Sequence, residues 1–170
     1  MQKIYNKGDN IMRLKMRYIL VGICLILCVY LTTFIKPTIN LSAKINDISI
    51  EDYNRIKKEG QGLPKDVDIK HLKHVDIQVN AKAPNILIKD INFNSEGFYD
   101  FLRDNEKVRM LGESRVTYNK KHTEILEVYL ENANAKDLRE VIEDFKYIVS
   151  WKNIWNFQDK EIFYLKDYLK

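Results

Sequence analysis

The chain has 170 residues, of which 45% are hydrophobic and 31% charged, which excludes a disordered protein and leaves room for one folded domain and an anchor. The net charge of +4 lies in residues 1–17, whereas residues 36–170 hold 23 basic and 23 acidic side chains. A nucleic-acid-binding protein needs a basic face on its folded part, so this distribution excludes nucleic acid as a partner. Frequent Ile, Lys and Asn with little Ala is typical of an AT-rich, bacterial genome.

The first predicted element is the uncharged apolar segment Tyr18–Ile35. Its length fits a membrane-spanning helix, which needs about 17–25 residues. Because the basic side chains precede it, we expect residues 1–17 to stay in the cytoplasm and the chain beyond to lie outside the cell membrane, as a single-pass protein. Met12 is an alternative start that keeps this basic flank. Aromatic residues that favour the headgroup region lie toward both ends of the segment: Tyr18, Tyr30 and Phe34.

A cleaved signal peptide and a lipoprotein signal are the two alternatives to an uncleaved anchor. The segment is longer than the core of a signal peptide, which has about 7–15 residues. The best cleavage site, Leu41-Ser42-Ala43, is a poor one. Lipoprotein signals carry a small residue before the lipidated cysteine, but Ile23 and Leu27 precede Cys24 and Cys28. We therefore predict an uncleaved anchor.

Residues 36–71 are predicted to form a connector with one short helix. Ser49 is its candidate N-cap, and Glu51 and Asp52 supply the negative charge that favours a first turn. This helix is interpreted as a stalk that lifts the outer domain from the membrane. From residue 72 the apolar period changes to two, which is typical of a strand, so the extracytoplasmic domain is assigned to residues 72–170.

The outer domain is predicted to be α+β. From residue 86 its elements follow the order strand, helix, strand, strand, helix, strand, which is the order of a ferredoxin-like (βαββαβ) fold. This fold is an antiparallel sheet with two helices on one face, to which extra edge strands can be added. The first helix has its N-cap at Ser95 and the second at Asn134. The last two strands are placed at 148–157 and 162–169.

No convincing catalytic or cofactor motif is present in the sequence, because glycine-rich nucleotide loops and serine-nucleophile motifs are missing. His71 and His74 have a spacing that metal ligands use, but without a third ligand we interpret them as solvated loop residues, and His122 as a turn residue. Three carboxylates raise the possibility of acid–base chemistry: Glu124, Glu127 and Glu131. On a strand, however, Glu127 and Glu131 share a face with Tyr129, which we interpret as the solvent-facing one. We therefore expect no enzyme activity, no cofactor and no metal.

Aromatic residues gather near the C-terminus. Trp151, Trp155 and Phe157 share one face of the strand predicted at 148–157. Large aromatic side chains are enriched at protein interfaces, and they also fill the cores of small domains. We expect most of this cluster in the core and one or two members exposed, and we take Trp151, Trp155 and Phe157 as the candidate partner interface.

One stretch resembles a known family. The strand Glu127–Glu131, the helix Leu138–Phe145 and the strand that begins with Tyr147–Val149 resemble the ferredoxin-like domains of type IV pilus and type II secretion alignment proteins of the inner membrane. That family also has a short cytoplasmic tail, one span and an outer domain, but usually a longer, coiled-coil connector. The resemblance implies a non-enzymatic scaffold that pairs with itself or with other membrane-anchored assembly proteins.

Two further functions are left open by the sequence. The chain can be an anchored component of another envelope machine, such as that of division or sporulation. It can also be an extracytoplasmic ligand-sensing domain, although we do not expect a small-molecule ligand.

Overall fold

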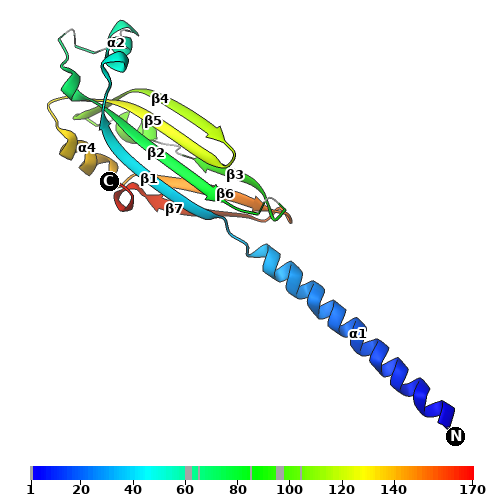
Figure 1. Cartoon of the computed structure of the whole chain (residues 1–170). Coiled ribbons are helices and arrows are strands. Elements are labelled where there is room, and N and C mark those ends of the chain that lie inside the picture. The colour runs from blue at the N-terminus through cyan, green and yellow to red at the C-terminus, as the bar shows by residue number, and fades with distance from the viewer. Residues whose placement is uncertain (1, 60–62, 65, 85, 95–97, 104) are drawn as a thin grey trace.

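The structure is a computed structural model that describes residues 2–59, 63–64, 66–84, 86–94, 98–103 and 105–170. A long helix, α1 (Gln2–Thr33), leads into an α+β domain, and it extends from the end of the domain at which β1 (Thr38–Asp47) begins (Figure 1). The part Met12–Thr33 is long and apolar enough to cross a membrane and is not buried against the domain. It is thus compatible with a single-pass anchor or with a signal sequence.

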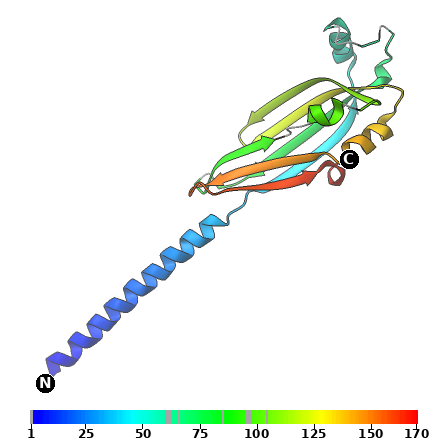
Figure 2. The same cartoon turned by 180° about the vertical axis from the view of Figure 1, so that it is seen from behind.

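In the described part of the chain, seven strands form two antiparallel sheets that stack face to face (Figures 1 and 2). The four-stranded sheet has the order β1-β2-β5-β4, and the three-stranded sheet has the order β3-β6-β7. The remaining strands are β2 (Leu72–Lys82), β3 (Ile88–Asn94), β4 (Val108–Tyr118), β5 (Lys121–Leu130), β6 (Lys146–Asn153) and β7 (Gln158–Tyr164).

The core lies between the two sheets, because strands such as β2 and β5 alternate apolar and polar residues and turn one face inward. In β5, for example, Leu126, Val128 and Leu130 are almost completely buried. They join one continuous cluster with side chains of the opposite sheet, such as Tyr147 and Val149. Burial of the apolar faces drives this stacking.

Two short helices carry the chain between the sheets. The helix α3 (Phe98–Arg103) leads from β3 to β4, and α4 (Ala135–Ile142) leads from β5 to β6. Both belong to the core, α3 through Phe98 and α4 through Leu138 and Ile142. The ring of Phe98 lies 4.1 Å from that of Phe145, which follows α4. The predicted cap Asn134 is confirmed, and it forms a capping box with Asp137. Ser95, the cap predicted for the earlier helix, lies outside the described residues.

The ferredoxin-like topology is not confirmed. The order of elements from β3 to β6 agrees with the prediction, but a single sheet would require a strand of the β4–β5 pair to bond to β3 or β6. Instead β5 is bonded to β4 on one edge and to β2 on the other, so it has no edge left. The pair β3–β6 therefore bonds to β7 and stacks on the four-stranded sheet.

The strand β1 lies in a segment that the sequence analysis assigned to the connector. It pairs with β2 from Thr38–Lys82 to Asp47–Lys73, and it buries Leu41 and Ala43 in the core. The C-terminus covers its outer edge, because the Ala43 amide donates to the Tyr168 carbonyl at 3.1 Å and the Lys170 amide donates to the Ala43 carbonyl at 3.1 Å. This cover includes the short 3₁₀ helix η2 (Leu165–Asp167).

The predicted short helix is present as α2 (Ile50–Glu59), with Ser49 accepting a hydrogen bond from the Asp52 amide. It lies at the end of the domain farthest from α1, however, so it does not form a stalk at the membrane (Figure 1). A second, smaller apolar cluster fixes it there beside the 3₁₀ helix η1 (Ile69–His71). The buried members of this cluster are Ile48, Ile56, Val67, Leu72 and Tyr129.

We expect Ala43→Asp to destabilise the domain by at least about 3 kcal/mol, because it places an unpaired charge in the core. Ser42→Asp is the matched control, since Ser42 lies on the opposite, half-exposed face of β1 and should change stability by about 0.5 kcal/mol or less. Thermal unfolding of the full-length protein in detergent, followed by tryptophan fluorescence, measures both. Equal stability of the two variants would mean that β1 is not part of the folded domain.

Candidate functional site

The end of the domain beside α1 contains the residues that the sequence analysis singled out as an interface. Here two side chains of the domain bond to the last turn of α1. The Asn153 amide nitrogen donates to the Thr33 carbonyl at 3.1 Å, and the Trp155 indole donates to the Thr32 hydroxyl at 2.9 Å. The helix is thus attached to the domain by contacts as well as by the chain.

Asn153 shapes the loop that carries these aromatic residues. Its side-chain oxygen accepts hydrogen bonds from the Trp155 and Phe157 amides at 2.9 and 3.0 Å, and Asn156 adopts a positive φ of 64°. Asparagine suits this position because its side chain can replace a backbone partner in a turn. The sequence analysis missed the role of Asn153, although asparagine is a recognisable turn signal because its side chain bonds to the backbone two residues further on.

The structure separates the three residues of the candidate interface. The strand β6 ends at Asn153, not at residue 157 as predicted, so Trp155 and Phe157 lie in the loop before β7 and do not share a strand face with Trp151. Trp151 is buried in the three-stranded sheet, whereas Trp155 and Phe157 are 47% and 61% exposed. The two loop aromatics are therefore free to meet a partner, and Trp151 packs inside.

Two polar side chains of β5, Glu124 and His122, are buried between the sheets, and they contact the more exposed Arg115 and Thr117 of β4. Glu124 is fully buried, with its carboxylate 3.5 Å from the Arg115 Nε and 3.7 Å from the His122 Nε2. A hydrogen bond of 2.6 Å joins the His122 Nδ1 to the Thr117 hydroxyl. The prediction that His122 is a turn residue is wrong, because Asn119 and Lys120 make the turn and His122 already faces inward on β5.

Burial decides the protonation of this group. Loss of solvent lowers the pKa of His122, and the neighbouring Arg115 charge lowers it further. The pKa of the Tyr147 hydroxyl is raised, first by burial and then by the Glu124 charge. Since Glu124 and His122 are almost inaccessible to solvent, the group acts on the stability of the sandwich and does not face a substrate.

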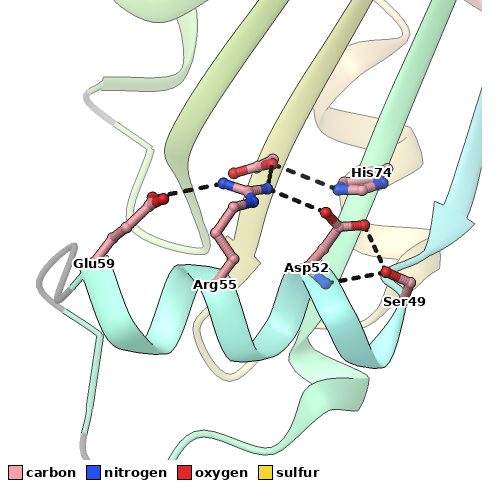
Figure 3. A network of polar contacts seen from close by, with 6 residues as sticks. Ser49, Asp52, Arg55, Glu59 and His74 are labelled. Carbon is pink, nitrogen blue, oxygen red and sulfur yellow. Dashed lines mark hydrogen bonds and ion pairs between the residues drawn. The ribbon is translucent and has the colours of Figure 1, made fainter.

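A network of charged side chains holds α2 against the four-stranded sheet. Figure 3 shows Arg55 extended from α2, between Asp52 and Glu59. Arg55 also bonds to Glu127 on β5, which raises the pKa of its guanidinium. The prediction that Glu127 lies on a bare solvent-facing strand is therefore wrong. Glu127 lies beneath α2, and its side chain is only 13% exposed.

The two spaced histidines are not brought together. His71 ends the helix η1, while His74 lies on β2 with its Nε2 3.8 Å from Glu127. Among the described residues, no group of three or more His, Cys, Asp or Glu side chains could hold a metal ion.

A shallow depression of about 270 Å³ lies on the four-stranded sheet. Most of the side chains around it are amides and hydroxyls that lie on the outer face of this sheet. They include Asn40 and Ser42 of β1, Gln78 and Asn80 of β2, and Thr123 of β5. Such a surface offers hydrogen-bonding groups but little apolar area, so it is a weak small-molecule site.

No protein-family model matches the chain, and no curated protein or solved structure is significantly similar to it.

We expect Trp151→Ala to destabilise the domain by about 3–5 kcal/mol, because it leaves a cavity in the core. Trp155→Ala should cost about 1 kcal/mol, since it removes one hydrogen bond and a half-exposed ring. Thermal unfolding of each variant, followed by far-ultraviolet circular dichroism, gives the comparison. The assignment of Trp151 to the core is wrong if the two substitutions cost the same.

We expect the stability of the domain to fall as the pH falls below about 6.5, the usual pKa of histidine. Below that pH the unfolded chain binds a proton at His122 that the folded domain resists, so folding loses at most about 1.4 kcal/mol per pH unit from this group. His122→Gln should reduce the change of the free energy of unfolding with pH, measured by urea unfolding between about pH 7 and about pH 5. These values lie on either side of the usual histidine pKa of about 6.5. His71→Gln is the control for loss of a histidine at the surface, and an unchanged slope in His122→Gln would contradict the assignment.

Proposed function

We propose that this chain is a single-pass membrane protein whose α+β domain acts outside the cytoplasm as a non-enzymatic interaction module. The observation that carries the proposal is the attachment of the domain to the end of α1 through Asn153 and Trp155. A membrane helix bonded to its domain holds that domain at a defined position above the bilayer, which is what a scaffold requires.

An uncleaved anchor is supported by the place of the best candidate cleavage site, Leu41-Ser42-Ala43. Cleavage after Ala43 would remove Thr38–Ala43 from β1, and with it two core side chains, Leu41 and Ala43. It would also release the C-terminal cover from the edge of the sheet. A signal peptide is expected to end before the folded domain begins, and here the domain begins at β1.

The orientation follows from the charge of the tail. Residues 1–17 carry five basic side chains and one acidic side chain immediately before the apolar segment. Basic residues that flank a span stay on the cytoplasmic side, so the domain lies on the far side.

An assembly role is supported by the edges of the sheets. Among the described strands, β4 bonds to β5 alone, so one of its edges is open. An open edge can accept a strand from another chain, and the exposed Val116 adds apolar surface there. The partner is then a second copy or another membrane-anchored assembly protein. A pilus or secretion platform is the machine that we propose first, and a division or sporulation machine is the alternative.

A ligand-sensing role is the second candidate, and the polar depression on the outer face of the four-stranded sheet favours it. Its amides and hydroxyls suit a polar ligand bound through hydrogen bonds.

The topology is tested by adding protease to intact protoplasts. We expect residues 36–170 to be digested while an epitope at the N-terminus is protected, because only the domain lies outside. A domain that is protected until the membrane is permeabilised would overturn the orientation.

The assembly role is tested by a photo-cross-linking residue placed at Val116 in living cells, with Glu140 on the exposed face of α4 as the matched control position. We expect a membrane-anchored partner, or a second copy, to be linked at Val116 and not at Glu140. If the purified full-length protein carries no cross-linked partner at either position, the open edge of β4 is not an assembly surface.

A further inference from the structure

Large apolar side chains are exposed together at the end of the domain beside α1. Nine large apolar side chains are well exposed outside α1 among the described residues, and five of them lie in the segment after the helix and in three loops or strand ends. They are Phe34 at 62%, Ile86 at 82%, Tyr118 at 72%, Trp155 at 47% and Phe157 at 61% exposure. We call this set the proximal face. Exposed apolar residues are common when they are scattered, but a contiguous group marks an interaction site.

The parts of the proximal face are tied to one another by hydrogen bonds. The Ile154 amide donates to the Leu87 carbonyl at 3.1 Å, which joins the loop of Trp155 to the turn that holds Ile86. The Lys120 ammonium donates to the Ala83 carbonyl at 3.1 Å, which joins that turn to the β4–β5 hairpin. The loops therefore form one surface.

The hydrogen bond to α1 sets the position of the proximal face relative to the end of the apolar segment. The Trp155 indole donates to the hydroxyl of Thr32, a residue of the apolar segment itself. Thr33, Phe34 and Ile35 follow Thr32 before the first charge at Lys36. When α1 crosses a bilayer, Trp155 must therefore lie level with the end of the span, and the strands extend away from it (Figure 1). Tryptophan and tyrosine favour that depth, because their rings are amphipathic.

The charge of this end suits a lipid surface. The segments 36–40, 80–90, 117–123 and 152–160 hold seven lysines and two aspartates, whereas residues 36–170 as a whole are neutral. One of the aspartates, Asp159, lies 3.9 Å from the Lys36 ammonium. The domain is thus basic toward α1 and acidic elsewhere. Lysines close to a membrane are attracted to anionic headgroups.

We infer that the proximal face docks on the bilayer that α1 crosses, with Trp155 and Phe157 in the headgroup region and the lysines at anionic phospholipids. This inference rests on the proposed function, because it requires α1 to be a membrane anchor. Docking fixes the domain upright on the membrane and leaves its far end, with α2, for other contacts.

The test uses the full-length protein in vesicles of phosphatidylcholine and phosphatidylglycerol, with or without bromine atoms near the headgroup end of the acyl chains. Trp151→Phe leaves Trp155 as the sole tryptophan, and Trp155→Phe is the matched variant that leaves the buried Trp151. Bromine quenches indole fluorescence only at short range. We expect the emission of Trp155 to fall about twofold in brominated vesicles, since a docked ring lies at headgroup depth, and that of Trp151 to stay unchanged.

An alkaline wash of the same vesicles distinguishes failure of the docking from failure of the membrane anchor on which it rests. If the protein is washed off, α1 is not an anchor and both proposals fail. If the protein stays but Trp155 is not quenched, the anchor holds and the docking is wrong, which leaves the proximal face to a protein partner. Equal quenching of both tryptophans would also overturn it, because the domain would then be inserted as a whole. Quenching of Trp155 that does not increase with phosphatidylglycerol would overturn the role of anionic lipid.

Discussion

The pairing of β5 on both edges is the constraint on which the rest of the fold depends. Its two neighbours, β2 and β4, take up its backbone hydrogen-bonding groups along nearly its whole length. The strands that follow cannot extend this sheet at β5, and each of them has an apolar face to bury. Stacking as a second sheet satisfies both requirements, because the ladder bonds are made within each sheet and the apolar faces meet between them.

This arrangement also determines what α3 and α4 do. In a ferredoxin-like domain the two helices cover a sheet face, but here that face is covered by the other sheet. The helices instead act as crossovers at the end of the sandwich away from α1, where Phe98, Leu138 and Ile142 complete the core. The opposite end is closed by tight loops, and these carry the aromatic side chains to the surface.

Much of the local structure could be predicted from the sequence, because it depends on neighbouring residues. The apolar segment, the cap at Asn134 and the alternation in β2 and β5 are signals of this kind. The pairing of strands could not be predicted, since it depends on which edges are already occupied. The strand β1 was missed although Leu41, Ala43 and Ile45 alternate with polar residues, because it follows the span directly and was interpreted as part of the connector.

The site shows the same division. The sequence identified Trp155 and Phe157 as surface candidates but grouped them with Trp151, because the end of β6 depends on the side chain of Asn153 and not on periodicity. Glu124 and Glu127 are close in sequence, and the sequence analysis placed Glu127 on a solvent-facing strand. They lie on opposite faces of β5, Glu124 between the sheets and Glu127 beneath α2. The period of two in a strand predicts that they lie on opposite faces, but it does not reveal what covers each face.

The position of β1 has a mechanical consequence. The chain passes from α1 directly into β1, and β1 runs along the sheet away from the helix (Figure 1). If α1 is the membrane anchor that we propose, a force between the membrane and a partner of the domain is applied along the axis of β1. The hydrogen bonds from Thr38–Lys82 to Asp47–Lys73 lie across that direction, so they resist in shear and share the load together, instead of opening one after another. The chain thus enters the domain from α1 in a geometry that resists being pulled apart.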